Sequence, residues 1–205
     1  MANKIEKVTP PAIPAPSLEY SAPVVTQRDS VFRLFFNRLT QSLLSLLSST
    51  QGGRFLYNPR GLFYSTTNQT AAASGTGYAV EFENTYISGG VSVASDSQIT
   101  VNYDGMYNFE VTLQVEQNNA SACQVFVWIN KNGADVPYGA HETTVSGSSL
   151  QTVHWNFSID LEAGQYIEMY WATDDTGLNL HTEAATSPHP GIPSAVVAVS
   201  YVSNM

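Results

Sequence analysis

The stretch Trp155–Trp171, WNFSIDLEAGQYIEMYW, decides the fold class of this chain. It holds two runs in which apolar and polar residues alternate, separated by Glu162-Ala163-Gly164. Because successive side chains on a strand point to opposite faces, each run predicts a strand with one apolar face. Gly164 tolerates the positive φ that a tight turn requires. The stretch is therefore either a β-hairpin or two successive strands joined at the end of a sandwich.

Similar alternation continues along the chain on both sides of this stretch. Asp104-Gly105 and Asn132-Gly133 are turn signals, and no helical pattern appears after residue 50. The other segments expected to be strands or parts of strands are Phe55–Tyr64, Tyr78–Tyr86, Val91–Val93, Ile99–Tyr103, Tyr107–Val115, Val125–Ile129, Leu178–His181 and Val196–Val202. About eight to ten short strands with regular turns predict an all-β antiparallel sandwich over residues 76–205, preceded by a linker and first strand over 51–75.

Residues 1–28 are expected to form an extended arm. Pro10, Pro11, Pro14, Pro16 and Pro23 oppose both helix and sheet hydrogen bonding and favour a polyproline-like conformation. The arm also carries apolar residues that a simple spacer does not need, and these are the candidate contacts to a larger particle: Ile13, Leu18, Tyr20, Val24 and Val25. Docking in a partner's groove and a flexible spacer both remain open.

Residues 29–50 predict an amphipathic helix, with Asp29 or Ser30 as its N-cap. Spacings of 4, 3, 4 and 3 form a short heptad seam, suited to a trimeric bundle, made of Phe32, Phe36, Leu39, Leu43 and Leu46. Leu34, Phe35, Leu44 and Leu47 widen the apolar surface. Such a helix needs cover, which sister chains, the β domain or a host particle could provide.

Charge is distributed unevenly along the 205 residues. Positions 1–60 hold seven basic and three acidic residues, 7 − 3 = +4, whereas the remainder holds one basic and fourteen acidic residues, 1 − 14 = −13. An acidic domain repels phosphates, which argues against binding to nucleic acid. The sequence begins with polar residues and has no long apolar run, so neither a secretion signal nor membrane insertion is expected.

No motif for catalysis, a cofactor or a metal emerges, so none is expected. His141, His154, His181 and His189 match no metal-binding spacing, and His154 is expected to face solvent or a subunit contact. Asp174, Asp175 and Glu183 could supply oxygen ligands to Ca²⁺, although a solvated acidic loop is the favoured interpretation. Cys123 is the lone cysteine and is expected to be a buried, inert thiol.

Two of the expected strands are apolar on both faces. Phe126 and Trp128 lie opposite the apolar face of one, and Tyr166 and Tyr170 lie opposite that of another. Such strands need cover on both sides, so these four residues are predicted to lie in the trimer interface. A sugar-stacking platform is the alternative use of these aromatics.

Four segments, in order, resemble the C1q/TNF-like jelly roll. ITVNYDGMYNFEV (Ile99–Val111) is similar to that family's strand–Gly–x–Tyr–strand motif, and VFVWINKNGADVP (Val125–Pro137) to the segment after it. WNFSIDLEAGQYIEMYW resembles its hairpin, with Gln165 in place of the usual aspartate, and IPSAVVAVSYV (Ile192–Val202) resembles its closing strand. The resemblance implies a jelly-roll domain over residues 76–205.

The whole arrangement also resembles small structural proteins of tailed bacteriophages. RLFFNRLT (Arg33–Thr40), after a proline-rich arm and before a β domain, carries this likeness, as do WATDDTGLNL (Trp171–Leu180) and SPHPGIPS (Ser187–Ser194). The resemblance implies a homotrimer on a virion, made in the host cytoplasm.

Three functions are compatible with these observations. The first is a non-enzymatic virion structural protein whose arm contacts other virion proteins. The second is a fibre or spike module that binds a host receptor or a host-surface glycan. The third is a glycan hydrolase, which would need two carboxylates in one cleft. The first is the expected function, and the chain is not expected to be an enzyme.

Overall fold

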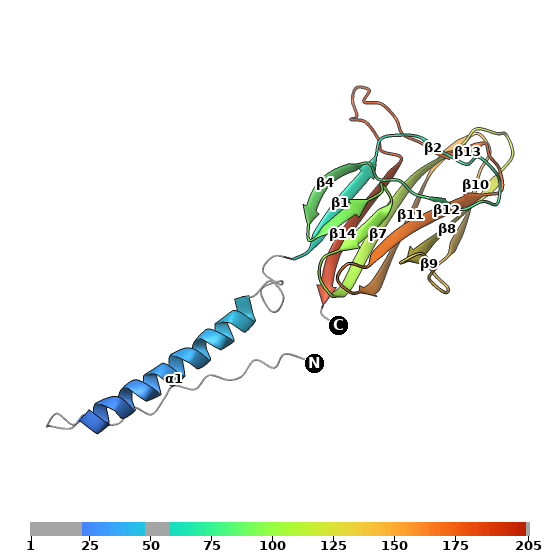
Figure 1. Ribbon diagram of the computed structural model, residues 1–205. Helices are drawn as coiled ribbons and strands as arrows, with labels where there is room; N and C mark the ends of the chain where they lie inside the picture. The colour runs from blue at the N-terminus through green and yellow to red at the C-terminus, as the bar shows by residue number, and fades with distance from the viewer. Residues whose placement is uncertain (1–21, 48–57, 204–205) are drawn as a thin grey trace. The chain divides into compact units, whose positions relative to one another are not determined.

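The computed structural model describes residues 22–47 and 58–203 of the chain (Figure 1). The chain divides into two compact units, Met1–Asn58 and Pro59–Met205. The first contributes one described helix, and the second is a β sandwich. We describe each unit by itself.

Helix α1 spans Ala22–Leu47, so it begins seven residues before the expected cap at Asp29. Residues 22–28, expected to belong to the extended arm, are therefore helical. Pro23 is compatible with this because the N–H groups of a helix's first turn have no partner within the helix. Asp29 lies beyond the first turn, and its Oδ1 is 3.4 Å from Nε of Arg28.

The β unit contains two antiparallel sheets that face each other. Sheet A has the strand order β2-β13-β7-β14-β1-β4, with β11 also paired to β7. Its strands are β1 (Arg60–Ser65), β2 (Gln69–Thr70), β4 (Asn84–Gly89), β7 (Gly105–Gln117), β11 (Ser149–Leu161), β13 (Leu178–Leu180) and β14 (Ala195–Ser203). Strand β7 pairs with β11 on one side and with β13 and β14 on the other.

Sheet B has the order β10-β8-β12-β6-β5, with β3 also paired to β12 and β9 to β8. Its strands are β3 (Tyr78–Ala79), β5 (Val91–Ala94), β6 (Gln98–Val101), β8 (Cys123–Lys131), β9 (Ala134–Asp135), β10 (His141–Val145) and β12 (Tyr166–Thr173). The expected antiparallel sandwich is therefore confirmed.

The sandwich begins earlier than the expected boundary at residue 76. Strand β1 pairs with β14 on one side and with β4 on the other, so it lies inside sheet A and not in a linker. Its alternation buries Phe63 and Ser65. Residues 59–75 therefore belong to the β unit.

The two runs of the stretch Trp155–Trp171 form β11 and β12, which lie in opposite sheets. Strand β11 pairs with β7 in sheet A, whereas β12 pairs with β8 in sheet B. The segment between them crosses the end of the sandwich, and Gly164 in it has φ +85°. Of the two arrangements open at the sequence level, successive strands at the end of a sandwich is the one observed.

Hydrogen bonds hold the crossing segment to the end of β6 and to the turn between β6 and β7. The Gly164 N–H donates to the carbonyl of Val101 at 2.8 Å, and the Ala163 N–H donates to Oδ1 of Asp104 at 2.8 Å. Oε1 of Gln165 accepts from the Glu162 N–H at 3.0 Å, so this side chain closes the turn. Gln165 therefore fits the turn.

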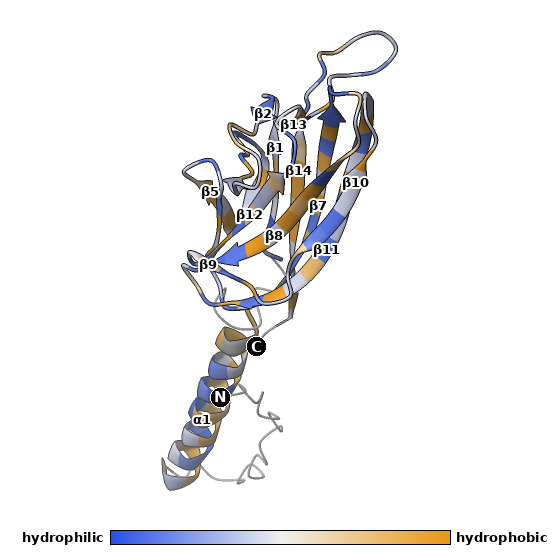
Figure 2. Ribbon diagram, turned by 90° about the vertical axis from the view of Figure 1, so that its right-hand side faces the viewer, coloured by the Kyte–Doolittle hydropathy of each residue, from blue (hydrophilic) through white to orange (hydrophobic). Residues whose placement is uncertain are grey.

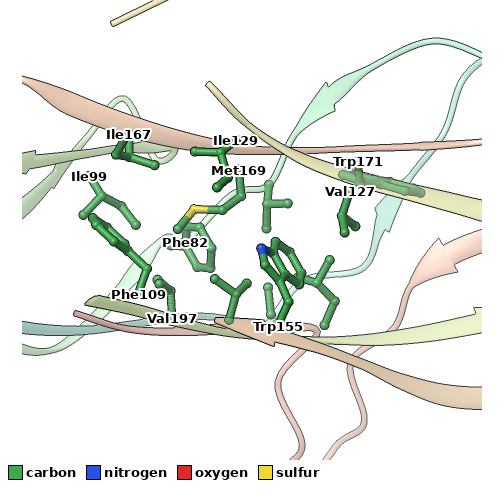
Figure 3. Packing of buried hydrophobic residues seen from close by; sticks show 14 of the residues in the cluster. Phe82, Ile99, Phe109, Val127, Ile129, Trp155, Ile167, Met169, Trp171 and Val197 are labelled. Carbon is green, nitrogen blue, oxygen red and sulfur yellow. The ribbon is translucent and has the colours of Figure 1, made fainter. Parts of the chain in front are cut away.

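The core lies between the sheets and is built by the alternation seen in the sequence. Trp155 and Phe109 reach it from sheet A, and Ile167, Met169 and Trp171 reach it from sheet B (Figure 3). Phe109 also stacks on Phe157, with ring centroids 5.0 Å apart. The apolar face of each strand is thus covered by the opposite sheet.

Candidate functional site

The outer face of sheet B carries four aromatic residues that the core does not use. Phe126 and Trp128 on β8 and Tyr166 and Tyr170 on β12 are all half-buried, and they alternate with side chains that point inward. Trp128 and Tyr170 are direct cross-strand neighbours, and their rings stack with centroids 5.5 Å apart and planes 26° apart. We call these four residues the aromatic face.

A glycine beside β12 makes room for the indole of Trp128. A Cβ placed on Gly77 would lie 2.8 Å from two carbons of the Trp128 ring, so a side chain there would displace the indole. The indole is also oriented from the other side, because its Nε1–H donates to Oδ1 of Asp135 at 2.9 Å. Trp128 is thus held between Gly77, just before β3, and Asp135 on β9.

Two buried polar side chains lie on the same outer face of sheet B. Glu168 on β12 is opposite Asn130 on β8, and their exposed fractions are 7% and 8%. Oε1 of Glu168 accepts a 2.6 Å hydrogen bond from the hydroxyl of Ser97. Oδ1 of Asn130 accepts no hydrogen bond from the described part of the chain.

Several carboxylates lie on or next to this face. Burial first, and then the neighbouring Glu168, Tyr166 and Asp135, raise the pKa of Tyr170. Within the described residues Glu168 takes part in no ion pair. Asp135 and Glu142 add carboxylates next to Trp128 and Phe126, where Glu142 is the β10 residue opposite Phe126.

The second notable surface is helix α1, along which hydrophobic and hydrophilic residues are interspersed (Figure 2). Five residues of the predicted seam are in this helix: Phe32 and Leu39 are half-buried, and Phe36, Leu43 and Leu46 are 58%, 45% and 39% exposed. Leu34, Leu44 and Leu47, outside the seam, are 54%, 57% and 61% exposed. The expected apolar helix surface is present, and within residues 22–47 most of its large side chains are exposed.

The residues predicted to contact a particle fall into two groups. Val24 and Val25 are half-buried residues near the start of α1, not parts of an extended arm. Ile13, Leu18 and Tyr20 lie outside the described residues. The structure therefore describes only Val24 and Val25 of the five predicted contact residues.

The acidic loop after β12 has a structural use. Oδ1 of Asp175 accepts from Nδ2 of Asn119 at 2.7 Å and from the Gly177 N–H at 2.9 Å, and Oδ2 accepts from Nε2 of Gln117 at 2.9 Å. These bonds, from Asn119 first, lower the pKa of Asp175. The carboxylate therefore fastens the loop to the end of β7. The sequence had favoured a solvated acidic loop here, with Ca²⁺ binding as the alternative.

The other candidate ligands are dispersed. Among residues 22–47 and 58–203, no group of three or more His, Cys, Asp or Glu side chains could hold a metal ion. Oδ1 of Asp174 accepts from the Gln124 N–H at 2.7 Å, away from Glu183, which lies 4.0 Å from His189. His154 is exposed, as expected, and its Nδ1 is 3.0 Å from the Thr112 hydroxyl.

Cys123 is buried, which confirms the expected environment of this thiol. Burial raises its pKa, and the charges of Asp174 and Asp175 act in the same direction. A raised pKa keeps the group in its less nucleophilic thiol form.

The sequence predicted the aromatic face but not the two buried polar residues beside it, Asn130 and Glu168. The alternation in β8 and β12 places Asn130 and Glu168 on the same side as Trp128 and Tyr170. That parity was visible in the sequence, whereas the burial of both residues depends on the neighbouring strands. Gly77 and Ser97 were missed because both lie in loops far from these strands in the sequence.

None of the known protein families matches this chain, and none of the curated proteins is significantly similar to it. In the part of the chain that the structure describes, no helix is long and apolar enough to cross a membrane.

Proposed function

We propose that this protein is a non-enzymatic structural protein of a bacteriophage particle, which assembles as a homotrimer through helix α1. The observation that carries the proposal is the apolar surface of α1. A helix with this many exposed Leu and Phe residues is stable in water only when another surface covers it. The seam spacing matches the knobs-into-holes packing of identical helices, so three copies are the proposed cover.

The fold supports a C1q/TNF-like jelly roll as the projecting domain. The central strands follow the order β1-β14-β7-β11 in sheet A and β6-β12-β8-β10 in sheet B. Eight strands in two four-stranded antiparallel sheets are typical of a jelly roll. The same family resemblance in four ordered sequence segments supports the assignment.

The particle assignment follows from the resemblance to phage structural proteins and from charge. From residue 59 onward the chain has two basic and fourteen acidic residues, 2 − 14 = −12. The segment before it carries most of the basic residues. An acidic domain is repelled by acidic neighbours, so the N-terminal segment is proposed to contact the particle and the sandwich to project. Three segments on one trimer would attach multivalently.

The test is incorporation into particles. Deleting residues 2–21 leaves all of α1 intact, which the expected arm boundary at residue 28 would not have done. The deleted protein should remain soluble and oligomeric but be absent from purified particles, measured by quantitative mass spectrometry. A second variant keeps Pro10, Pro11, Pro14 and Pro16 but replaces Lys4 and Lys7 by Gln, and it separates the contribution of these two charges from that of the rest of the segment. Incorporation of the deleted protein at the level of the unaltered protein would contradict the proposed attachment.

A glycan-binding function is the second candidate. The aromatic face favours it, because Trp128 and Tyr170 are held in a stacked pair with polar groups around them. The predicted use of this face as a trimer interface stays a prediction. Its carboxylates weigh against that use, since copies related by symmetry would bring like charges together.

A further inference from the structure

We propose that the aromatic face of sheet B binds a glycan that carries a free, protonated amino group. In this proposal Trp128 and Tyr170 contact the apolar side of the sugar ring, and Glu168 and Asn130 hold the ammonium group. The proposal deepens the second candidate function above, on which it rests, and uses none of the residues of α1. Its success or failure is therefore independent of trimer formation.

The first argument is a buried carboxylate without a counter-ion. Glu168 is 7% exposed, and its hydrogen-bond donor is the neutral hydroxyl of Ser97. A buried charge is costly unless it is paired, and removing a partner from a buried pair is strongly unfavourable. No Lys or Arg of the described residues pairs with Glu168. A cation from a ligand would supply the missing partner.

The second argument is the unused acceptor beside it. Asn130 is 8% exposed, its Oδ1 accepts no hydrogen bond from the described residues, and it lies directly across from Glu168. Buried amide oxygens are normally satisfied, so this one calls for a donor. An ammonium group has three donors and no acceptor, which suits a carboxylate and a carbonyl oxygen together.

The third argument is the aromatic wall next to this polar pair. The rings of Trp128 and Tyr170 stack at 5.5 Å, and the Trp128 ring is oriented by Asp135. Aromatic faces attract cations and pack against apolar surfaces, and Trp is the best of them. A sugar with an amino group offers both an apolar ring side and a cation in one unit.

Main-chain pairing argues for a glycan over a peptide. Strand β8 pairs with β12 on one side and with β9 and β10 on the other, and β12 pairs with β8 and with β3 and β6. Both strands are therefore interior strands without a free edge to which a peptide could add as a strand. The ligand must be recognised by side chains alone, which suits a saccharide.

The experiment compares two tetrasaccharides that differ in the amino group. Isothermal titration calorimetry would use the full chain, the β-1,4-linked glucosamine tetramer and its fully N-acetylated form, at about pH 6, where amines are protonated. We expect the free-amine tetramer to bind at least about tenfold more tightly than the acetylated one. Tetralysine is included as a cation without a sugar ring and should bind at least about tenfold more weakly.

Variants locate the binding on the surface. Glu168→Gln should weaken binding of the free-amine tetramer about tenfold or more, because it removes the charge but keeps the shape. Glu110→Gln is the matched control, since Glu110 is exposed on β7 of the opposite sheet. The comparison of the two tetramers needs no variant, so it stands even where Glu168→Gln fails to fold.

Three results would overturn the proposal. They are equal binding of the two tetramers, failure of the free-amine tetramer to bind at millimolar concentration, and tetralysine binding as tightly as the free-amine tetramer. The third result would assign the face to a basic peptide.

Discussion

Helix α1 and the β sandwich place their apolar side chains in opposite environments. In the sandwich, Phe63, Phe109 and Leu113 are 0% exposed, whereas Phe36, Leu44 and Leu47 of α1 are 58%, 57% and 61% exposed. The two sheets cover each other, so the sandwich completes its own core. Within residues 22–47, by contrast, helix α1 keeps large apolar side chains exposed. The difference teaches that alternation in the β unit is enough to build a core, whereas the apolar pattern of α1 leaves its side chains exposed among the described residues; our proposal of a helical trimer starts from this difference.

Truncating one phenylalanine in each unit gives the largest expected contrast. Phe109→Ala should lower the free energy of unfolding of the sandwich by about 3–5 kcal/mol, because it opens a cavity and removes the stacking on Phe157. Phe36→Ala should leave that free energy almost unchanged. Chemical denaturation followed by tryptophan fluorescence measures both, since all three tryptophans lie in the sandwich. Equal losses would mean that the helix is part of the sandwich's folding unit.

A pair of glycines within the sandwich tests how tightly its end is packed. A Cβ on Gly105, where φ is +153°, would lie 2.3 Å from the Tyr201 ring and 2.6 Å from the carbonyl oxygen of Ser203. Gly105→Ala should therefore cost roughly 1–3 kcal/mol through overpacking. Gly75→Ala is the matched control, because φ is +67° but nothing lies within 4 Å of the added Cβ. A thermal melt in which Gly75→Ala is the more damaging variant would contradict this packing.

The smallest expected effect is a pH dependence confined to the sandwich. Hydrogen bonds from Asn119, Gly177 and Gln117 lower the pKa of Asp175 in the folded state. A carboxyl group whose pKa is lower in the folded state stabilises the fold at pH values above the ordinary aspartate pKa. This stabilisation is lost as the pH falls through the folded-state pKa. The melting temperature of the unaltered chain should thus fall more on acidification than that of Asp175→Asn. Asp160→Asn, on the exposed side of β11, should behave like the unaltered chain.

Glu83 should add to this acid sensitivity of the sandwich. Burial opposes ionisation of its carboxyl group, but hydrogen bonds from Thr66, from its own backbone N–H and from the Ser65 side chain together outweigh burial and lower its pKa. Glu83→Gln should therefore flatten the loss of melting temperature on acidification, as Asp175→Asn does. Parallel curves for Glu83→Gln and the unaltered chain would show that this carboxylate does not contribute.

The sequence predicted strands well where alternation was long and pure. Strands β7 and β11 follow the runs around Phe109 and Trp155, and Asn132-Gly133, with φ +51° and +84°, forms the expected turn between β8 and β9. Period-two patterns are local, so one segment suffices to show them. Strand β1 begins at Arg60, inside the expected segment Phe55–Tyr64 and directly after Asn58-Pro59, a turn signal that marks its start.

Pairing and helix boundaries were harder to predict. Local alternation does not say which sheet a strand joins, so the assignment of β11 and β12 to opposite sheets required the structure. The short strand β10 has exposed residues at four of five positions and carries no apolar pattern. At the N-terminus, five prolines suggested an extended arm as far as residue 28, yet Pro23 fits within the first turn of α1.

The sequence predicted the aromatic residues of the candidate site but not its buried polar residues, because burial depends on distant parts of the chain. Trp128 and Tyr170 stand out by residue type, whereas Glu168 looks like any exposed charged residue on a strand. Its burial depends on Ser97 and on the aromatic residues around it, which come from distant parts of the chain. Polar residues become informative when their burial and partners are known.

Sedimentation equilibrium of the full chain tests the central claim most directly. The chain's mass is 22.2 kDa, so three copies should give about 67 kDa, three times 22.2 kDa. Replacing Phe36 and Leu43 by Asp should shift the mass to that of one chain, because buried unpaired charges would enter the seam. Replacing Asn37 and Thr40, off the seam, by Asp should leave the mass at 67 kDa. A well-folded unaltered chain that sediments as a 22.2 kDa monomer would contradict the account.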